Sequence, residues 1–176
     1  MADTFKARLV KIGQTTLLVL PKEASAPLPS RGMVAITGTL NDHPFWAVLE
    51  PDGRGSHWLK VDKPLRDAAG IVVGKLADVT LRPTKKWQEP DIPADIIAGL
   101  KADSEGYKIW QDITPMARWD WIRWIRATNN PDTRAKHVDV MLSKLKHGIR
   151  RPCCFNRSMC TDFSVAKNGV LLAPQD

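Results

Sequence analysis

The stretch LVLPKEASAPLPSRGMVAITG, from Leu18 to Gly38, decides how the first half of the chain folds. A strand-like run is followed by Lys22, a short helix-forming stretch, Gly32 and a second strand-like run. The same order returns in LKVDKPLRDAAGIVVGKLADVTL, from Leu59 to Leu81. Two copies of such a strand–helix–strand unit predict a small β-barrel with an internal pseudo-two-fold axis.

Further strand-like segments fill the rest of residues 1–83. FKARLV alternates apolar and polar side chains, which is the period of a half-buried strand. Gly, Pro, Asn or Asp bounds each segment, and the two glycines of PDGRG suit a hairpin connection. Six short strands predict a small closed barrel, and they are FKARLV (5–10), TLLVLP (16–21), MVAITGTL (33–40), PFWAVLE (44–50), HWLKVD (57–62) and DVTLRP (78–83).

The period becomes helical after the polar, proline-containing segment TKKWQEPDIP, residues 84–93. Thr114 before a proline and Asn130 before Pro131 are expected to start helices, because their side chains can accept from free backbone N–H groups. Val138, Met141, Leu142 and Leu145 stand at i, i+3, i+4 and i+7, the spacing of one buried helix face. The second half is therefore predicted to be a small helical bundle.

The predicted fold is α+β with two domains. A small closed β-barrel with a pseudo-two-fold repeat occupies residues 1–83, and a linker occupies 84–92. A small helical bundle follows over 93–150, and a short C-terminal tail, 151–176, is expected to pack back on the domains.

The helical half resembles the YdeI/OmpD-associated family, also called the bacteriocin-protection family. TPMARWDWIRWI (114–125) and PDTRAKHVDVMLSKLKHG (131–148) carry this resemblance. The β half resembles the domain of unknown function often fused ahead of that family, in LVLPKE, in residues 34–70 and in VGKLADVTL. VKIGQTTLLVLPKEA also looks like the opening strand and turn of AbrB-type barrels. The resemblance implies the architecture and the domain order, and the family's motifs carry no assigned catalytic group.

The odd number of cysteines and the lack of an export signal predict a soluble cytoplasmic protein, and the family resemblance implies a bacterial one. No apolar block of signal-peptide or membrane-helix length is present, so we expect no membrane insertion. Net charge is +7, but basic and acidic residues are mixed throughout, which leaves nucleic acid possible as a partner but not favoured. The main expected partner is an unknown protein or small molecule.

The tryptophans supply the candidate site. Four of the seven lie between positions 110 and 124, and a Trp-lined pocket with arginines can take an anion or a stacked ligand. The alternative is that they fill the core. Thr133 and Arg134, the polar signature implied by the resemblance, allow either an anion site at a helix start or a bridge to a nearby acid. The candidate ligand-binding residues are Trp121, Trp124, Arg118, Arg123 and Arg134.

The three cysteines, Cys153, Cys154 and Cys160, are spaced poorly for a zinc site, which usually places two ligands two to four residues apart. We expect no metal and no cofactor. A redox pair and a reactive thiol near Arg150 and Arg151 stay open as alternatives. The favoured interpretation is packing of the tail, with Cys153 or Cys154 buried.

These observations predict a non-enzymatic binding or stress-protection module of bacteriocin-protection type, with a small ligand or a protein partner held at the interdomain cleft. One alternative is an enzyme that uses the Trp-lined cleft, for which a perturbed His, Asp or Cys beside the tryptophans would argue. Another is a DNA-binding regulator of AbrB-like barrel type, with a basic face that includes some of Lys6, Arg8, Lys11 and Lys22. No catalytic residue can be assigned from the sequence.

Overall fold

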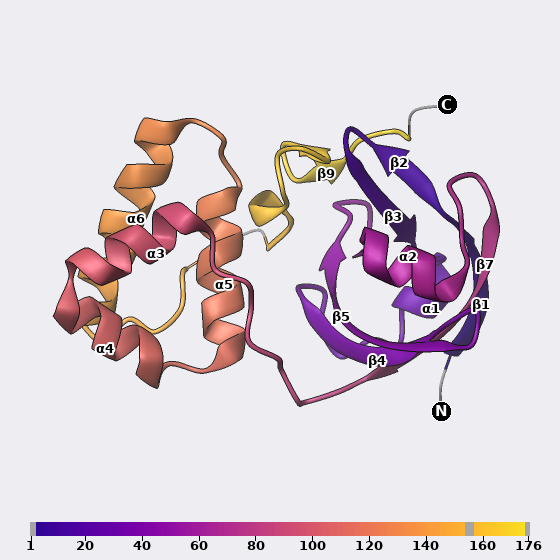
Figure 1. Ribbon diagram of the computed structural model, residues 1–176, viewed down its shortest axis with the longest axis horizontal. Coiled ribbons are helices and arrows are strands. Elements are labelled where there is room, and N and C mark those ends of the chain that lie inside the picture. Colours follow the sequence, from indigo (N-terminus) through magenta and orange to yellow (C-terminus); the bar gives the residue numbers. More distant parts are fainter. Residues whose placement is uncertain (1–2, 154–156, 175–176) are drawn as a thin grey trace. The chain divides into compact units, whose positions relative to one another are not determined.

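The computed structural model describes residues 3–153 and 157–174 of the chain (Figure 1). Two compact units make up the protein, a sheet domain formed by residues 1–86 with 157–176 and a helical domain formed by residues 87–156. Each is described separately. In the described part of the chain, no helix has the length and apolar character needed to cross a membrane.

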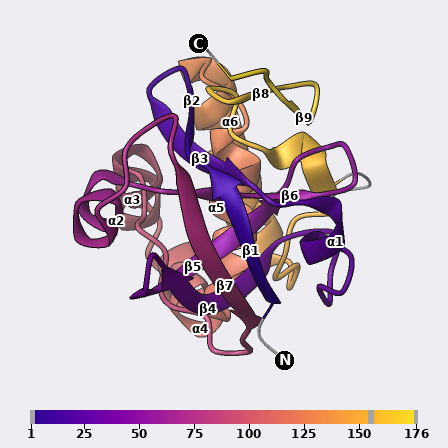
Figure 2. The same ribbon diagram turned by 90° about the vertical axis from the view of Figure 1, so that its right-hand side faces the viewer.

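The sheet domain is built on one antiparallel sheet with the strand order β1-β7-β4-β5-β6-β3-β2 (Figure 2). Short helices α1 (Lys22–Ser25) and α2 (Lys63–Ala69) lie between strands, where the sequence places its helix-forming stretches. The strands are β1 (Asp3–Arg8), β2 (Val10–Ile12), β3 (Thr15–Val19), β4 (Val34–Leu40), β5 (His43–Pro51), β6 (His57–Lys60) and β7 (Leu76–Pro83).

The predicted closed barrel is wrong, because the sheet is an open half-barrel. β1 pairs with β7, and β2 pairs with β3. β1 and β2 therefore stand at opposite ends of the strand order and do not pair with each other. The chain changes partner at Leu9: its N–H donates to Lys75 O (2.9 Å) and its carbonyl accepts from Gly74 N–H (2.7 Å). Those bonds continue the β7 side of the sheet, and the β2–β3 ladder begins only at Val10. The single strand expected over residues 5–10 is therefore split in two.

The two similar sequence segments lie side by side in this sheet. Each forms a strand, a short helix and a strand: β3–α1–β4 and β6–α2–β7. β3 pairs with β6 and β4 pairs with β7, both antiparallel. Inside the curved sheet, aliphatic side chains such as Leu18, Ile36, Leu49 and Leu59 are fully buried and form the main core.

The C-terminal segment packs on the β5–β6 hairpin of the same domain. Its elements are a 3-10 turn (Arg157–Cys160) and the strands β8 (Ala166–Lys167) and β9 (Val170–Leu171). Leu171 N–H donates to Asp52 O (3.0 Å), and a Cβ added at Gly53 would lie 2.2 Å from Gly169 O, so the two backbones touch. Val165 and Leu171 bury a second core with Trp58.

The two described cysteines, Cys153 and Cys160, differ in domain and in burial. Cys160 is buried beside the sheet domain, whereas Cys153, the last described residue of the helical domain, is exposed. Cys154 lies outside the described residues. Cys153 is not the buried one, and the expectation that either Cys153 or Cys154 is buried stays a prediction.

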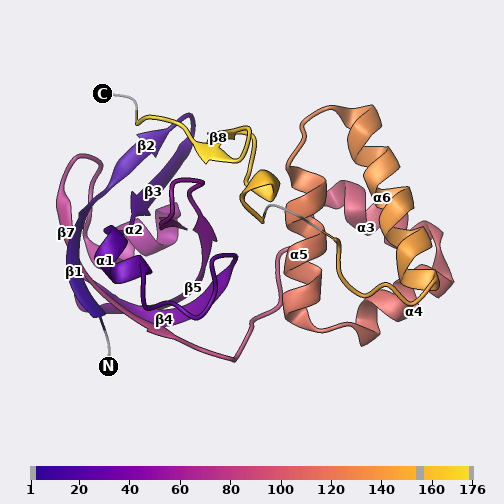
Figure 3. The ribbon, with the colours of Figure 1, turned by 180° about the vertical axis from the view of Figure 1, so that it is seen from behind.

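The described residues of the helical domain, 87–153, form four helices, α3 (Ala94–Ala102), α4 (Ser104–Asp112), α5 (Pro115–Arg126) and α6 (Pro131–Lys146) (Figure 3). The predicted caps are confirmed: Thr114 accepts from Ala117 N–H (3.2 Å) and Asn130 accepts from Thr133 N–H (3.0 Å). The predicted buried face of α6 is also confirmed, since Val138, Met141, Leu142 and Leu145 are all buried in the domain's core.

Candidate functional site

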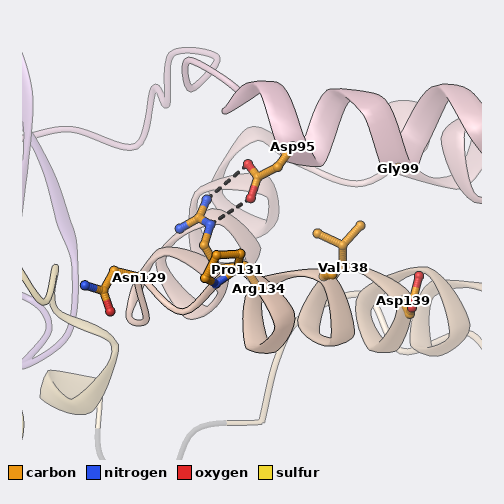
Figure 4. A pocket seen from close by; sticks show the side chains of 8 residues that line it. Asp95, Gly99, Asn129, Pro131, Arg134, Val138 and Asp139 are labelled. Atoms are coloured by element: carbon orange, nitrogen blue, oxygen red, sulfur yellow. Dashed lines mark hydrogen bonds and ion pairs between the residues drawn. The ribbon is translucent and has the colours of Figure 1, made fainter.

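A pocket of about 380 Å³ lies at the N-terminal ends of α3 and α6 in the helical domain (Figure 4). Both helices begin close to it, with Asp95 in the first turn of α3 and Arg134 in the first turn of α6. Eight residues line the pocket: Asp95, Gly99, Asn129, Pro131, Arg134, Ala135, Val138 and Asp139.

The wall of the pocket is held by a bidentate ion pair between Arg134 and Asp95, which joins α6 to α3 (Figure 4). Arg134 Nε and Nη2 donate to the two carboxylate oxygens at 2.7 and 3.1 Å, and Nη1 donates to Thr128 O at 3.3 Å. Of the two interpretations of Arg134 from the sequence, the bridge to a nearby acid is confirmed. The guanidinium already holds an anion from its own chain.

The start of α6 is shaped by local sequence. Asn130 Oδ1 accepts from both the N–H and the hydroxyl of Thr133, at 3.0 and 3.2 Å, and Pro131 occupies the first helical position. This cap occupies the Thr133 N–H, one of the free N–H groups at the helix start that could otherwise bind an anion. Asn129 stands just outside the helix and is exposed at the pocket's rim.

The floor of the pocket depends on a close approach of the two helices. A Cβ added at Gly99 would lie 2.4 Å from Val138 Cγ1, so α3 reaches α6 only because this position lacks a side chain. Val138 is buried, while Pro131 and Ala135 are exposed. Their aliphatic atoms give the pocket an apolar surface beside its charged wall.

Charge in the pocket is net negative. It contains two carboxylates, Asp95 and Asp139, and one guanidinium, Arg134. The hydrogen bond from Arg134 lowers the pKa of Asp95 below 3.8, so this carboxylate is ionised at neutral pH although partial burial opposes the shift. Asp139 is exposed and makes no ion pair with any described residue. The arrangement favours a ligand with a cationic head.

The predicted tryptophans pack in the helical domain and do not line this pocket. Trp121 is fully buried, and its Nε1–H donates to Arg150 O at 2.9 Å. Trp124 meets Trp121 edge-on with ring centroids 5.8 Å apart, and it stacks on His137 at 4.1 Å. Their neighbours are those of a core, the alternative given for them from the sequence.

The predicted arginines serve different parts of the domain. Arg118 Nε and Nη2 donate to Trp110 O and Gln111 O at 2.9 and 2.8 Å, at the carbonyl end of α4, and Nη1 pairs with Glu89. A cation there complements the helix dipole. Arg123 is buried with an exposed fraction of 3%. Among the five predicted ligand residues, Arg134 is the one that lines the pocket.

His137 meets part of the condition set for an enzyme, because it is a perturbed histidine beside a tryptophan. Burial, together with the charge of Arg134, lowers its pKa below 6.5, although a backbone hydrogen bond to Trp124 opposes the shift. Its Nδ1 is buried and bonds to no group in the part of the chain that the structure describes. The Trp124 backbone orients the ring but is neither an acid nor a nucleophile, so the catalytic alternative stays a prediction.

The sheet domain also contains a buried polar network that the sequence did not predict. Ser25 Oγ lies 2.8 Å from His57 Nδ1, His57 Nε2 donates to Gly32 O at 2.9 Å, and Arg31 donates to Ser25 O at 2.5 Å. Ser25 and His57 have exposed fractions of 0%. A catalytic serine has to reach its substrate, and Ser25 is fully buried. The contact between Ser25 and His57 therefore stabilises the fold. The two residues are 32 positions apart and carry no local signal.

Metal ligands are not gathered in the described ranges 3–153 and 157–174, where no group of three or more His, Cys, Asp or Glu residues could hold an ion. The exposed basic residues named for a DNA-binding face include Lys6, which pairs with Asp78 at 2.6 Å. The expected ligand at the cleft between the domains stays a prediction, and the site is built from the helical domain alone.

Two family models match the chain, and the boundary between them agrees with the boundary between the sheet domain and the helical domain near residue 86. Residues 5–81 match the family model described as "Domain of unknown function (DUF1905)". Residues 89–148 match the model described as "Bacteriocin-protection, YdeI or OmpD-Associated", and this range contains the whole pocket. No curated protein matches the chain.

Proposed function

The chain is a YdeI/OmpD-associated family protein with an N-terminal domain of unknown function, and from this premise we propose that it is a non-enzymatic binding module whose helical domain holds a cationic side chain of a peptide. The observation that carries this proposal is the pocket at the start of α3 and α6, with its two carboxylates and one guanidinium. It lies within the family-matched range, and the Asn130 cap fixes the start of α6.

Electrostatics support the choice of a cation. Because Asp95 already satisfies Arg134, the carboxylate left for a ligand is Asp139, with the side-chain oxygen of Asn129 at the rim. A charge-assisted hydrogen bond from an ammonium or guanidinium to a carboxylate is about twice as strong as a neutral one. An incoming anion would meet a net negative surface.

Shape and polarity support Lys or Arg in particular. Both side chains carry a flexible aliphatic stem that packs on apolar surface while the charged head reaches a polar partner. Pro131, Ala135 and Val138 offer that apolar surface between the charged groups. The family's description names bacteriocin protection, which fits a peptide or protein partner with Lys and Arg as its cationic side chains.

Nuclear magnetic resonance titration tests the proposal on the full ¹⁵N-labelled chain. The probes are N-acetyl-lysine methylamide and N-acetyl-arginine methylamide, and we expect them to shift the amide signals of residues 129, 130 and 132–139. Asp139→Asn should weaken binding about tenfold, the worth of a hydrogen bond to a charged group.

Asp132→Asn is the matched control, because Asp132 is an exposed acid on the same helix that does not line the pocket. This variant should bind as the parent chain does. Equal binding by Asp139→Asn and the parent chain would contradict the proposal. Shifts caused by benzoate in place of the two cationic probes would also contradict it and would favour an anion held by Arg134.

A further inference from the structure

The connection between α2 and β7 carries an exposed apolar tip, called the valine tip below and formed by residues 72–76. Val72, Val73 and Leu76 have exposed fractions of 61%, 44% and 55%. The connection stands out at the margin of the sheet (Figures 1 and 3). A Cβ added at Gly70 or Gly74 would meet no atom within 4 Å, so the space around both glycines is open. Contiguous exposed aliphatic side chains of this kind mark an interaction surface.

Backbone hydrogen bonds hold the valine tip in place. Gly74 N–H donates to Leu9 O at 2.7 Å, Leu9 N–H donates to Lys75 O at 2.9 Å, and Lys75 N–H closes a turn on Val72 O at 3.2 Å. Ile71, just before the tip, is buried and anchors it to the core. The exposed valines are therefore presented by a fixed turn, which lowers the entropy lost on binding.

Cations flank the valine tip. Lys75 belongs to it, and the guanidinium of Arg8 donates to Gly74 O from the neighbouring strand. Both residues are exposed. Residues 1–86 as a whole contain 13 Lys or Arg and 8 Asp or Glu, so the domain that bears the tip is basic. An anionic partner is complementary to this surface.

The nearest acids are mostly neutralised by lysines. Asp67 pairs with Lys63 at 2.5 Å and Asp78 pairs with Lys6 at 2.6 Å. Asp42 lies in the turn between β4 and β5, which is hydrogen-bonded to Asp78, and it makes no ion pair with any residue the structure describes. One free carboxylate near the tip leaves the balance of local charge positive.

We infer that the valine tip is a peripheral docking point for an anionic phospholipid surface. A protein partner would need roughly 800 Å² of contact on this side, far more than three aliphatic side chains on a turn present. A lipid surface needs only a few apolar side chains at the headgroup boundary, with cations beside them. The tip inserts its valines between headgroups while Arg8 and Lys75 meet lipid phosphates.

Vesicle co-sedimentation of the full chain tests this inference. Vesicles of phosphatidylcholine with about 30% phosphatidylglycerol should bind the protein, pure phosphatidylcholine should bind it much less, and added salt should weaken binding. The double variant Val72→Ser/Val73→Ser should lower the partition coefficient about tenfold. Lys75→Gln should lower it about fivefold, and Asp42→Asn should raise it by a similar factor.

Two control variants distinguish binding through the valine tip from non-specific binding to vesicles. Val140→Ser/Ile149→Ser removes exposed aliphatic side chains of the helical domain, and Lys60→Gln removes an exposed lysine of the same sheet domain. Both should bind vesicles as the parent chain does. Equal binding to the two kinds of vesicle, or full binding by the valine variant, would overturn the inference. Displacement by inorganic phosphate at an ionic strength at which sodium chloride leaves the protein bound would do so as well, since it would indicate a site for a free phosphate group.

Discussion

Each domain of this protein contains a histidine with buried ring atoms, and the two histidines differ in the hydrogen bonds that their rings make. In the sheet domain His57 uses both ring nitrogens, with Ser25 Oγ and Gly32 O as partners, and its exposed fraction is 0%. In the helical domain His137 lies partly exposed against the ring of Trp124, and its buried Nδ1 has no partner among the described residues. Two polar bonds hold the first ring, whereas the second ring has a backbone hydrogen bond to Trp124 and the stack on its indole.

The contrast shows how differently the two domains resist change. A fully buried carbonyl that loses its hydrogen-bond donor is destabilising, whereas removal of a partly exposed stacked ring mainly loses contact area. Strand ladders fix the sheet domain over its whole length, and side chains set the spacing of the helices. The two domains are therefore expected to respond differently to substitutions at their packing contacts.

Replacing the two histidines gives the largest expected difference. His57→Ala should lower the free energy of unfolding of the sheet domain by about 3 kcal/mol, because Gly32 O loses its donor and a cavity remains. His137→Ala should lower that of the helical domain by about 1 kcal/mol, the worth of an aromatic stack. Hydrogen exchange with mass spectrometry reads each domain separately. Equal losses in the two variants would remove the contrast.

Glycine substitutions probe the same difference through packing. A Cβ at Gly38 in β4 would lie 1.9 Å from Thr80 O, a backbone atom of the paired strand. Gly38→Ala should therefore cost about 2–3 kcal/mol, measured by urea unfolding.

At Gly99 the obstacle is a side-chain atom, Val138 Cγ1, 2.4 Å from the added Cβ. Alanine also has a higher helix propensity than glycine, by about 1 kcal/mol. Gly99→Ala should accordingly change the free energy of unfolding by only about 1 kcal/mol. A loss as large as that of Gly38→Ala would indicate that α3 and α6 are as rigidly spaced as the strands.

Helix starts and buried faces were predictable because their signals are local. Asn130 before Pro131 and the four apolar positions of α6 act within one or two turns, and the structure follows them. The hairpin glycines of the β5–β6 connection have the expected positive φ, 75° at Gly53 and 89° at Gly55.

Hydrogen-bond partners distant in sequence were not predictable in this way. Whether the sheet closes into a barrel depends on which neighbouring segment forms backbone hydrogen bonds with Leu9. The alternation of apolar and polar side chains is the same in an open and in a closed sheet, so it could not decide between them. The pocket depends on the pairing of Arg134 with Asp95, 39 positions away. The sequence offered that pairing as one alternative for Arg134 but contained no signal for which acid it would meet.

The pH dependence of stability should follow both histidines. Burial is the main cause that lowers the pKa of His57 and of His137 below 6.5 in the folded protein. The unfolded chain therefore binds protons more readily, and stability falls as pH drops below about 6.5 towards the lower folded pKa values. His57→Gln should make the decline in the sheet domain shallower, and His137→Gln should do so in the helical domain, as thermal unfolding between pH 8 and 5 would record. An unchanged decline in both variants would contradict this assignment.

The smallest effect on stability, and the most informative for the pocket, is expected at the Arg134–Asp95 pair. Asp95 is 43% exposed, so Asp95→Asn should cost less than about 1 kcal/mol at neutral pH. The Asp95 pKa is lowered when folded, so this contribution is present above pH 3.8 and disappears as pH falls through the folded pKa.

Binding should change in opposite directions when the two partners are replaced. Asp95→Asn raises the charge of the pocket and should weaken binding of N-acetyl-lysine methylamide, whereas Arg134→Gln lowers that charge and should strengthen it, each by about fivefold. Calorimetry of the two variants measures both changes. If both variants weaken binding equally, then the shape of the ion pair rather than the net charge of the pocket holds the ligand, and the cationic preference inferred from Asp139 is lost.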